Sequence, residues 1–285
     1  MLETDEDKKY DELFKHLKID CGACFGLCCV ALYFSTSEGF PANKDAGKPC
    51  VNLQSDFSCA VHQDLRNKGL KGCTAYDCFG AGQKIAKVTY KGKDWRKEPK
   101  VSKQMFETFL IMRQLHEMLW YLTQAFTLEA TDTIKDDLYL MMKQTEQLTN
   151  LEPDSLMKLD IDAHRTKVNL LLRQVSERVR AKVCQNNKAS GKKNLAKGFS
   201  FIGADLRKVN LIGADFGGVL LIAANLKGTD LSGANLIAAD LRDADIRGAN
   251  LSNSLFLTQA QINAARGDDN TKLPKALSRP TYWEK

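Results

Sequence analysis

The sequence lacks any apolar run that approaches the roughly 18 residues needed to cross a membrane. Its first residues, MLETDEDKKYDELF, have neither the basic start nor the apolar stretch of a secretory signal. Neither sign of charge dominates, since the net charge is only +6 over 285 residues, so composition alone indicates neither nucleic acid nor an acidic membrane as a partner. We therefore expect a cytoplasmic protein with no membrane partner.

Cysteine is nearly absent outside one segment of the chain. Of the nine cysteines, all but Cys184 lie between Cys21 and Cys78. A reducing cytoplasm disfavours structural disulfides, so clustered thiols there more often bind metal or carry out redox chemistry. This uneven distribution therefore requires its own explanation.

The motifs of several enzyme classes are also missing. The stretch HEMLW at His116 begins like a zinc-protease motif, but Trp120 stands where the second histidine is needed. FGAGQK lacks the third glycine of a dinucleotide loop, and no nucleophile elbow occurs. We interpret His116 and His164 as core or interface histidines. We interpret the basic run KIAKVTYKGKDWRKEPK, which carries Tyr90 and Trp95, as a solvated edge strand and loop rather than a nucleic-acid surface.

The last third of the chain repeats every five residues. A bulky apolar residue recurs at Phe201, Leu206, Leu211, Phe216, Leu221, Leu226, Leu231, Leu236, Leu241, Ile246, Leu251 and Phe256. A small residue often stands two positions earlier, Asp or Asn directly before it, and Gly two positions after it. This period matches neither a helix nor a strand, and it predicts one similar bend every five residues, with Asn, Asp and Gly at the bends. The bulky and small residues are expected to point inward and to stack on their copies.

This A(D/N)LXX pattern resembles the pentapeptide-repeat proteins over about residues 197–258. The resemblance implies a right-handed quadrilateral β-helix with four pentapeptides per coil, hence three coils and a length of about 15 Å. TQAQINAARGDDNTKLP breaks the period and is expected to cap the last coil. Some pentapeptide-repeat proteins mimic DNA and bind DNA gyrase. That function is disfavoured here, because the acidic and basic residues between 197 and 256 balance.

The middle of the chain carries a helical period. Apolar residues at three-to-four spacing predict four helices, over residues 101–126, 132–148, 152–159 and 162–183. Together they predict a helical bundle over about 100–184, and the polar stretch CQNNKASGKKN after it is interpreted as a linker.

The clustered cysteines have the spacing of metal ligands, with two to four residues between the members of several pairs. The candidate ligands are Cys21, Cys24, Cys28, Cys29, Cys50, Cys59, His62, Cys73 and Cys78. Thiolates are soft ligands and select zinc, iron–sulfur clusters or monovalent copper. Eight sulfurs exceed the four that one tetrahedral zinc takes, which leaves two sites, one site with bystander thiols, or a cluster.

Three stretches in order, CGACFGLCC, KPCVNLQSDFSCAVH and GCTAYDCFGAGQ, resemble the zinc- or iron-chelating CxxCxxCC family over about residues 20–83. The family pattern has one residue fewer between Cys24 and the Cys28–Cys29 pair, which leaves open which of the first four sulfurs are ligands. The combination of this module with pentapeptide repeats also resembles a bacterial group of pentapeptide-repeat proteins.

The sequence thus predicts a multidomain protein. Its expected parts are a Cys-rich metal-binding module (1–98), an α-helical bundle (99–185), a linker (186–196), a pentapeptide-repeat β-helix (197–260) and a C-terminal cap and tail (261–285). We expect bound zinc or iron, including an iron–sulfur cluster as one form. We also expect a protein partner on the repeats, a homodimer through the helices, and no nucleic-acid partner. The alternative function is an iron–sulfur or metal-dependent redox or modification enzyme with exposed, low-pKa thiolates.

Overall fold

The computed structural model describes residues 12–186, 193–194 and 200–283. The chain divides into two compact units: unit 1 comprises Met1–Thr127 with Asp136–Leu170, and unit 2 comprises Leu128–Lys135 with Leu171–Lys285. Within the described ranges, no helix combines the length and apolar character that crossing a membrane requires.

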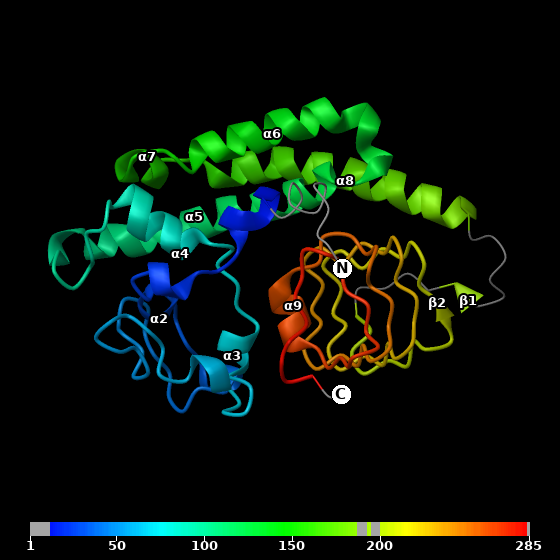
Figure 1. The fold of residues 1–285 in the computed structure, drawn as a ribbon, viewed down its shortest axis with the longest axis horizontal. Helices are drawn as coiled ribbons and strands as arrows, with labels where there is room; N and C mark the ends of the chain where they lie inside the picture. The colour runs from blue at the N-terminus through cyan, green and yellow to red at the C-terminus, as the bar shows by residue number, and fades with distance from the viewer. Residues whose placement is uncertain (1–11, 187–192, 195–199, 284–285) are drawn as a thin grey trace, which may run out of the picture. The chain divides into compact units, whose positions relative to one another are not determined.

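The first part of unit 1 consists of short helical turns joined by loops (Figure 1). These are η1 (Lys15–Leu17), η2 (Cys21–Ala23), α2 (Leu27–Ala31), η3 (Thr36–Glu38), η4 (His62–Asp64), α3 (Lys71–Thr74), α4 (Ala81–Lys84) and η5 (Ile85–Thr89). Isolated antiparallel bridges, Phe34 to Lys44 and Leu53 to Cys59, fold the loops back on themselves. Phe34, Phe40 and Leu70 form a small apolar cluster beneath them.

The four predicted helices are confirmed. They are α5 (Pro99–Phe126), α6 (Lys135–Leu148), α7 (Pro153–Met157) and α8 (Ile161–Asn186), and the short turn η6 (Glu129–Ile134) precedes α6. Helix α5 begins two residues earlier than predicted because Pro99, which has no N–H to leave unbonded, suits a first helical position. In unit 1, α5 contacts η1, α2, α4 and α7, so the Cys-bearing turns are held on a long helix.

The predicted edge strand in the basic run is wrong, since its first part is helical. Residues 81–84 form α4, and residues 85–89 continue as the π-helical turn η5, with Ile85 buried against α5. The aromatic side chains of the run serve the interior of unit 1. Tyr90 donates a hydrogen bond to Gln104 at 3.2 Å, and the Trp95 indole N–H donates to the carbonyl of Phe25 at 2.8 Å. Both side chains therefore help to hold unit 1 together.

The repeat region, residues 200–256, pairs with itself at a distance of 20 residues along the chain. Isolated parallel bridges join Ser200 to Leu220, Asp205 to Asn225, Asp215 to Asn235, Leu220 to Asp240, Asn225 to Asp245, Asp230 to Asn250, and Asn235 to Leu255. Each such pair is held by backbone hydrogen bonds, for example from Leu206 N to Asn225 O and from Asn225 N to Ala204 O. Figure 1 shows the result as stacked turns of chain in yellow and orange.

A short two-stranded sheet lies at the start of these turns. It consists of β1 (Lys193–Asn194) and β2 (Val209–Asn210), which pair in parallel. Two residues of the predicted linker are thus a strand, because their backbone groups bond to the first turn of the repeat region. Asn186, the first residue of the predicted linker, is the last residue of α8, and linker residues 187–192 and 195–196 lie outside the described residues.

The predicted inward face of the repeats is confirmed by burial. Every bulky repeat residue from Leu206 to Phe256 is buried, whereas Phe201 at the edge is half-buried. At the small position, Ala224, Ala234 and Ala249 are fully buried. Thr229 takes the same position with its hydroxyl satisfied, because it donates to the carbonyl of Leu226 at 2.7 Å.

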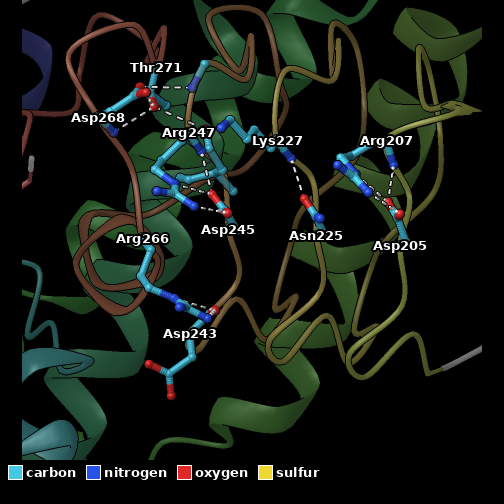
Figure 2. Close-up of polar contacts among 12 residues, drawn as sticks. Asp205, Arg207, Asn225, Lys227, Asp243, Asp245, Arg247, Arg266, Asp268 and Thr271 are labelled. Atoms are coloured by element: carbon cyan, nitrogen blue, oxygen red, sulfur yellow. Dashed lines mark hydrogen bonds and ion pairs between the residues drawn. The ribbon is translucent and has the colours of Figure 1, made fainter.

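The bends use the side chains that the pattern assigned to them. Asp205, Asn225 and Asp245 each accept a hydrogen bond from the backbone N–H two residues later. Figure 2 shows these acceptors on successive turns, with basic residues following them. Arg207 and Arg247 also form ion pairs with Asp205 and Asp245, at 2.6 and 2.7 Å. Hydrogen bonds from Arg207 lower the pKa of Asp205 to about 2.

After the last repeat, the chain turns into α9 (Gln259–Ala264), which begins with a capping box between Thr258 and Gln261. The Gln261 amide also donates to the carbonyls of Leu236 and Ala239, at 2.8 Å each. Beyond α9, Arg266 and Lys272 bond to the last turn, and bridges join Arg266 to Asp245 and Lys272 to Asn250. The two residues of each of these bridges are more than 20 positions apart in the sequence, because α9 is inserted between them. In Figure 1, α9 lies at the end of the turns away from β1 and β2.

Candidate metal centre

The eight clustered cysteines all lie in unit 1, and all are free thiols. Cys29 is buried, Cys21 is exposed, and the other six are intermediate. Cys184 lies apart in unit 2, where it is exposed on α8 and its thiol donates to the carbonyl of Ile212 at 3.8 Å. This ninth cysteine thus belongs to a different unit of the chain from the other eight.

Backbone contacts bring four of the cysteines toward one another around the end of α2. The N–H of Cys50 donates to the carbonyl of Cys29 at 2.9 Å, which places the second segment against the helix. The bridge between Leu53 and Cys59 then turns the chain back beside Cys50. Cys73 reaches the same place from α3, because it packs with Cys50 on the cluster of Phe34, Phe40 and Leu70.

The other four cysteines gather at the start of α4. The N–H of Cys24 bonds to the carbonyl of Cys21, and the N–H of Ala81 bonds to the carbonyl of Cys78. The sulfur of Cys24 lies directly over Gly82, where an added Cβ would stand only 2.6 Å from it. A side chain at this point of α4 would therefore displace the Cys24 sulfur, and Gly82 follows Cys78 by four residues.

Local backbone geometry shapes the first cysteine loop. Gly26 has φ 62° and precedes α2, and a Cβ there would approach the Leu53 side chain and the Phe57 carbonyl. The Trp95 indole holds this loop through Phe25, and the Phe25 and Phe57 rings lie 5.4 Å apart. The loop from Cys21 to Cys29 is therefore fixed from both sides.

The adjacent pair Cys28 and Cys29 joins the two groups, with 3.9 Å between the sulfurs. A hydrogen bond from Cys28 and the nearby Lys44 ammonium lower the pKa of the Cys29 thiol. The same hydrogen bond, followed by burial, raises the pKa of Cys28 well above its usual value. Within this pair, Cys29 is thus the thiol that ionises first.

Burial raises the pKa of the surrounding thiols, to about 11 for Cys21, Cys24 and Cys78 and to about 12 for Cys73. Repulsion from neighbouring thiolates adds to the rise for each of these groups. These groups are therefore protonated at neutral pH unless a cation offsets the charge, since a thiolate cluster alone repels itself.

Lys44 supplies one fixed positive charge beside the cluster. Its ammonium donates to the carbonyls of Leu32 at 2.5 Å, Lys48 at 2.8 Å and Asp45 at 3.0 Å. Burial lowers its pKa, while the charges of Cys50 and Cys29 raise it. Backbone carbonyls thus hold the ammonium at the end of α2, near the thiols of Cys50 and Cys29.

Tyr76 leaves a buried polar atom without a partner. Its hydroxyl is buried and, within the part of the chain that the structure describes, makes no hydrogen bond. Burial and then the charges of Cys78 and Cys28 raise its pKa well above the usual value, so the phenol lies close to these sulfurs. An unbonded buried hydroxyl costs about 1–3 kcal/mol, and a thiolate or a metal-bound group at these sulfurs would accept its hydrogen bond. The donor set thus fits a thiophilic metal ion or cluster.

The sulfurs are nonetheless not arranged as a closed site. Among the described residues, no group of three or more His, Cys, Asp or Glu side chains is positioned to hold a metal ion. Backbone contacts bring the cysteine-bearing segments together, but the side chains as they stand hold no metal ion. The ligand set named from the sequence stays a prediction.

The histidines stand outside this arrangement. His62 is exposed on η4 and is not among the groups that act on the thiol pKa values. His116 is buried, and its Nδ1 lies 2.7 Å from the carbonyl of Phe79, while Nε2 of His164 lies 2.9 Å from the Thr145 hydroxyl. The interpretation of His116 and His164 as core histidines is confirmed.

Sequence reasoning missed Lys44, Tyr76 and Gly82. Tyr76 stands inside the motif CTAYDC, so its position between two cysteines was a usable signal. Lys44 and Gly82 reach the thiols only through the tertiary fold, and nothing in their local sequence marks them.

The repeats and the stacked turns define a pentapeptide-repeat protein. Residues 196–221 and 216–253 match the pentapeptide repeats, with eight copies. Over 275 residues the chain is 51% identical to a protein from Bacillus subtilis (strain 168), "Uncharacterized protein YybG", and the match covers 96% of this chain and 98% of that protein. The chain belongs to the same family as YybG.

Proposed function

We propose that this is a cytoplasmic metal-binding protein that holds zinc or iron through its N-terminal cysteines. In the same proposal, its repeats form a right-handed quadrilateral β-helix that serves as a platform for a protein partner. The observation that carries the metal assignment is the gathering of eight free thiols around α2, with the unbonded Tyr76 hydroxyl beside two of them.

The chemistry of the surroundings supports this assignment. A thiolate ligand must be deprotonated, and a bound divalent cation offsets both the burial and the mutual repulsion that raise these pKa values. When bound, the metal supplies either a structural cross-link or, if it is an iron–sulfur cluster, electron transfer. Disulfides are an alternative use of paired thiols, but a reducing cytoplasm disfavours them.

Elemental analysis of anaerobically purified protein tests the metal assignment. We expect at least about one equivalent of zinc or iron per chain, because even a single closed site takes one ion. Less than about half an equivalent of any transition metal would contradict the proposal. Acid-labile sulfide, measured on the same sample, separates an iron–sulfur centre from zinc and so tests the redox-enzyme alternative.

The platform role of the repeats is supported by their surface chemistry. Parallel pairing at 20 residues agrees with four pentapeptides per coil, and it sets Arg207, Lys227 and Arg247 in a row (Figure 2). DNA mimicry is a weaker alternative, because the carboxylates of Asp205 and Asp245 are paired with arginines. A DNA mimic would inhibit gyrase supercoiling, whereas a platform would not. Inhibition at micromolar protein would therefore overturn our assignment.

A substitution in the row of Arg207, Lys227 and Arg247 tests the platform role directly. Proteins that bind specifically to the wild-type chain should no longer bind to the Lys227→Glu variant, in which the charge at this position is reversed. Lys208→Glu, also in the repeat region but outside the row, is the control. Identical binding by both variants would contradict the proposed role of this face.

A further inference from the structure

Most of the electrostatic interactions among the eight clustered thiols run within two groups of four. The first quartet is defined as Cys21, Cys24, Cys28 and Cys78. The second quartet is defined as Cys29, Cys50, Cys59 and Cys73. The division rests on backbone contacts and on the electrostatic interactions that link the thiols within each group.

The first quartet is assembled at the start of α4. The hydrogen bond between Cys24 N and Cys21 O makes the tight turn η2, and the Cys24 sulfur lies on Gly82. Cys24 and Cys28 both interact electrostatically with Cys78, and Cys78 interacts with Cys21. The Tyr76 hydroxyl adds an independent indication here, since it is buried, has no hydrogen-bond partner among the described residues, and lies near Cys78 and Cys28.

The second quartet is assembled at the end of α2. The backbone bond from Cys50 to Cys29, the bridge at Cys59 and the shared apolar support under Cys50 and Cys73 belong to this side. Cys59 and Cys73 both interact electrostatically with Cys29 and Cys50. The Lys44 ammonium interacts most strongly with Cys50 and Cys29, so its charge belongs to this quartet.

The paired cysteines explain how the two groups stay distinct and adjacent. Consecutive residues on a helix point about 100° apart, so Cys28 and Cys29 face different sides of α2. Their sulfurs are still only 3.9 Å apart, which sets the two groups side by side. Interactions also cross between the groups, from Cys29 to Cys21 and Cys24 and from Cys21 to Cys59, as expected of neighbouring sites.

We infer that each quartet is a separate four-cysteine site for a thiophilic metal ion, so that one chain holds two metal centres next to each other across the Cys28–Cys29 pair. This inference rests on the proposed metal-binding function and adds to it the number of centres and the ligands of each. His62 takes no part, because four thiolates complete a tetrahedral site on either side. Tyr76 is a positioning residue of the first site, where its hydroxyl donates to a ligand sulfur.

The test uses the full-length chain, reconstituted anaerobically with Zn²⁺ and freed of excess ion. Wild type should retain about two equivalents of zinc, because eight thiolates complete two tetrahedral sites. Cys78→Ser, in the first quartet, and Cys73→Ser, in the second, should each retain about one, and Cys184→Ser should retain two as the matched control.

A measurement on the unaltered chain keeps the inference testable if a variant fails to fold. With one equivalent of Zn²⁺, brief alkylation followed by mass spectrometry of the intact chain and its gas-phase fragments should find molecules in which the four thiols of one quartet are protected together. Molecules whose four protected thiols are drawn from both quartets would overturn the division.

The outcomes separate this inference from the function on which it rests. Wild-type protein that retains no zinc and no iron refutes the metal-binding proposal itself. One equivalent in wild type, or loss of both ions in each single variant, leaves metal binding intact but refutes two independent sites in favour of a single site or one shared cluster. Acid-labile sulfide in protein isolated with iron distinguishes clusters from mononuclear ions in either case.

Discussion

The buried imidazole of His116 should make the stability of unit 1 fall steeply in mild acid. Burial lowers its pKa from 6.5 to about 4, and the nearby charges of Lys84 and His16 act in the same direction, while the hydrogen bond to the Phe79 carbonyl opposes the shift. Because that carbonyl can only accept, the neutral ring carries its proton on Nδ1.

The direction of the pH effect on stability depends on which state, folded or unfolded, binds the proton. Between pH 6.5 and 4, the unfolded chain protonates His116 and the folded chain does not, so stability is lost as pH falls through this window. With these two pKa values, the loss is about 2 kcal/mol at pH 5 and about 3 kcal/mol at pH 4, relative to neutral pH.

The matched variant is His116→Asn, whose amide N–H can still donate to the Phe79 carbonyl but does not titrate. Urea unfolding of both proteins at pH 7.5 and pH 5 can be followed by tryptophan fluorescence, since Trp120 packs near Phe79. The loss on acidification should be about 2 kcal/mol smaller in the variant, and any effect of metal release is common to both proteins. Equal losses, or an imidazole that titrates near 6.5 by NMR, would refute this reasoning.

Three further predictions concern packing and the candidate metal centre. Leu226→Ala, in the fully buried repeat core, should lower the free energy of unfolding by about 2–5 kcal/mol, whereas Leu220→Ala, at an exposed position, should change it far less in the same thermal or urea experiment. Gly82→Ala should weaken zinc binding by about 10–100-fold in chelator competition, because the new Cβ displaces the adjacent sulfur, whereas Gly22→Ala meets only an ordinary contact and should bind like wild type. Tyr76→Phe should leave the metal-free protein as stable or about 1–3 kcal/mol more stable while weakening metal binding, and the reverse pattern would show that the hydroxyl has no role at the sulfurs.

The repeat region shows how far local pattern can predict a structure. Each five-residue unit contains its own bend, so a short-range pattern was enough to assign the inward positions of Leu226 and Ala224 and the hydrogen-bonding role of Asn225. Ala223 with φ 53° takes the bend conformation that Gly228 with φ 66° takes in the next unit, so the bend does not depend on glycine at every repeat. The helices were equally accessible, because their apolar faces recur at a local period.

The candidate metal centre was only partly accessible from sequence. The thiols could be named from their spacing, but their division required contacts such as the one between Cys24 and Gly82, which depends on how α4 packs. The helical course of residues 85–89 was missed because Ile85 and Ala86 make a buried π-helical turn that no regular period marks. His62 has ligand spacing in the sequence, yet the η4 turn leaves it exposed.

Helix α8 has a consequence for anyone who divides this chain into fragments. Its second half belongs to unit 2, where Val183 lies against Gly233 and Arg180 bonds to Asp215 at 2.9 Å. A recombinant fragment that starts at the first pentapeptide would lack these α8 residues. It would lose their contacts with the repeats and expose the glycine that Val183 covers. The smallest autonomous repeat fragment should therefore start no later than Leu171, well upstream of the boundary that the five-residue period alone would suggest.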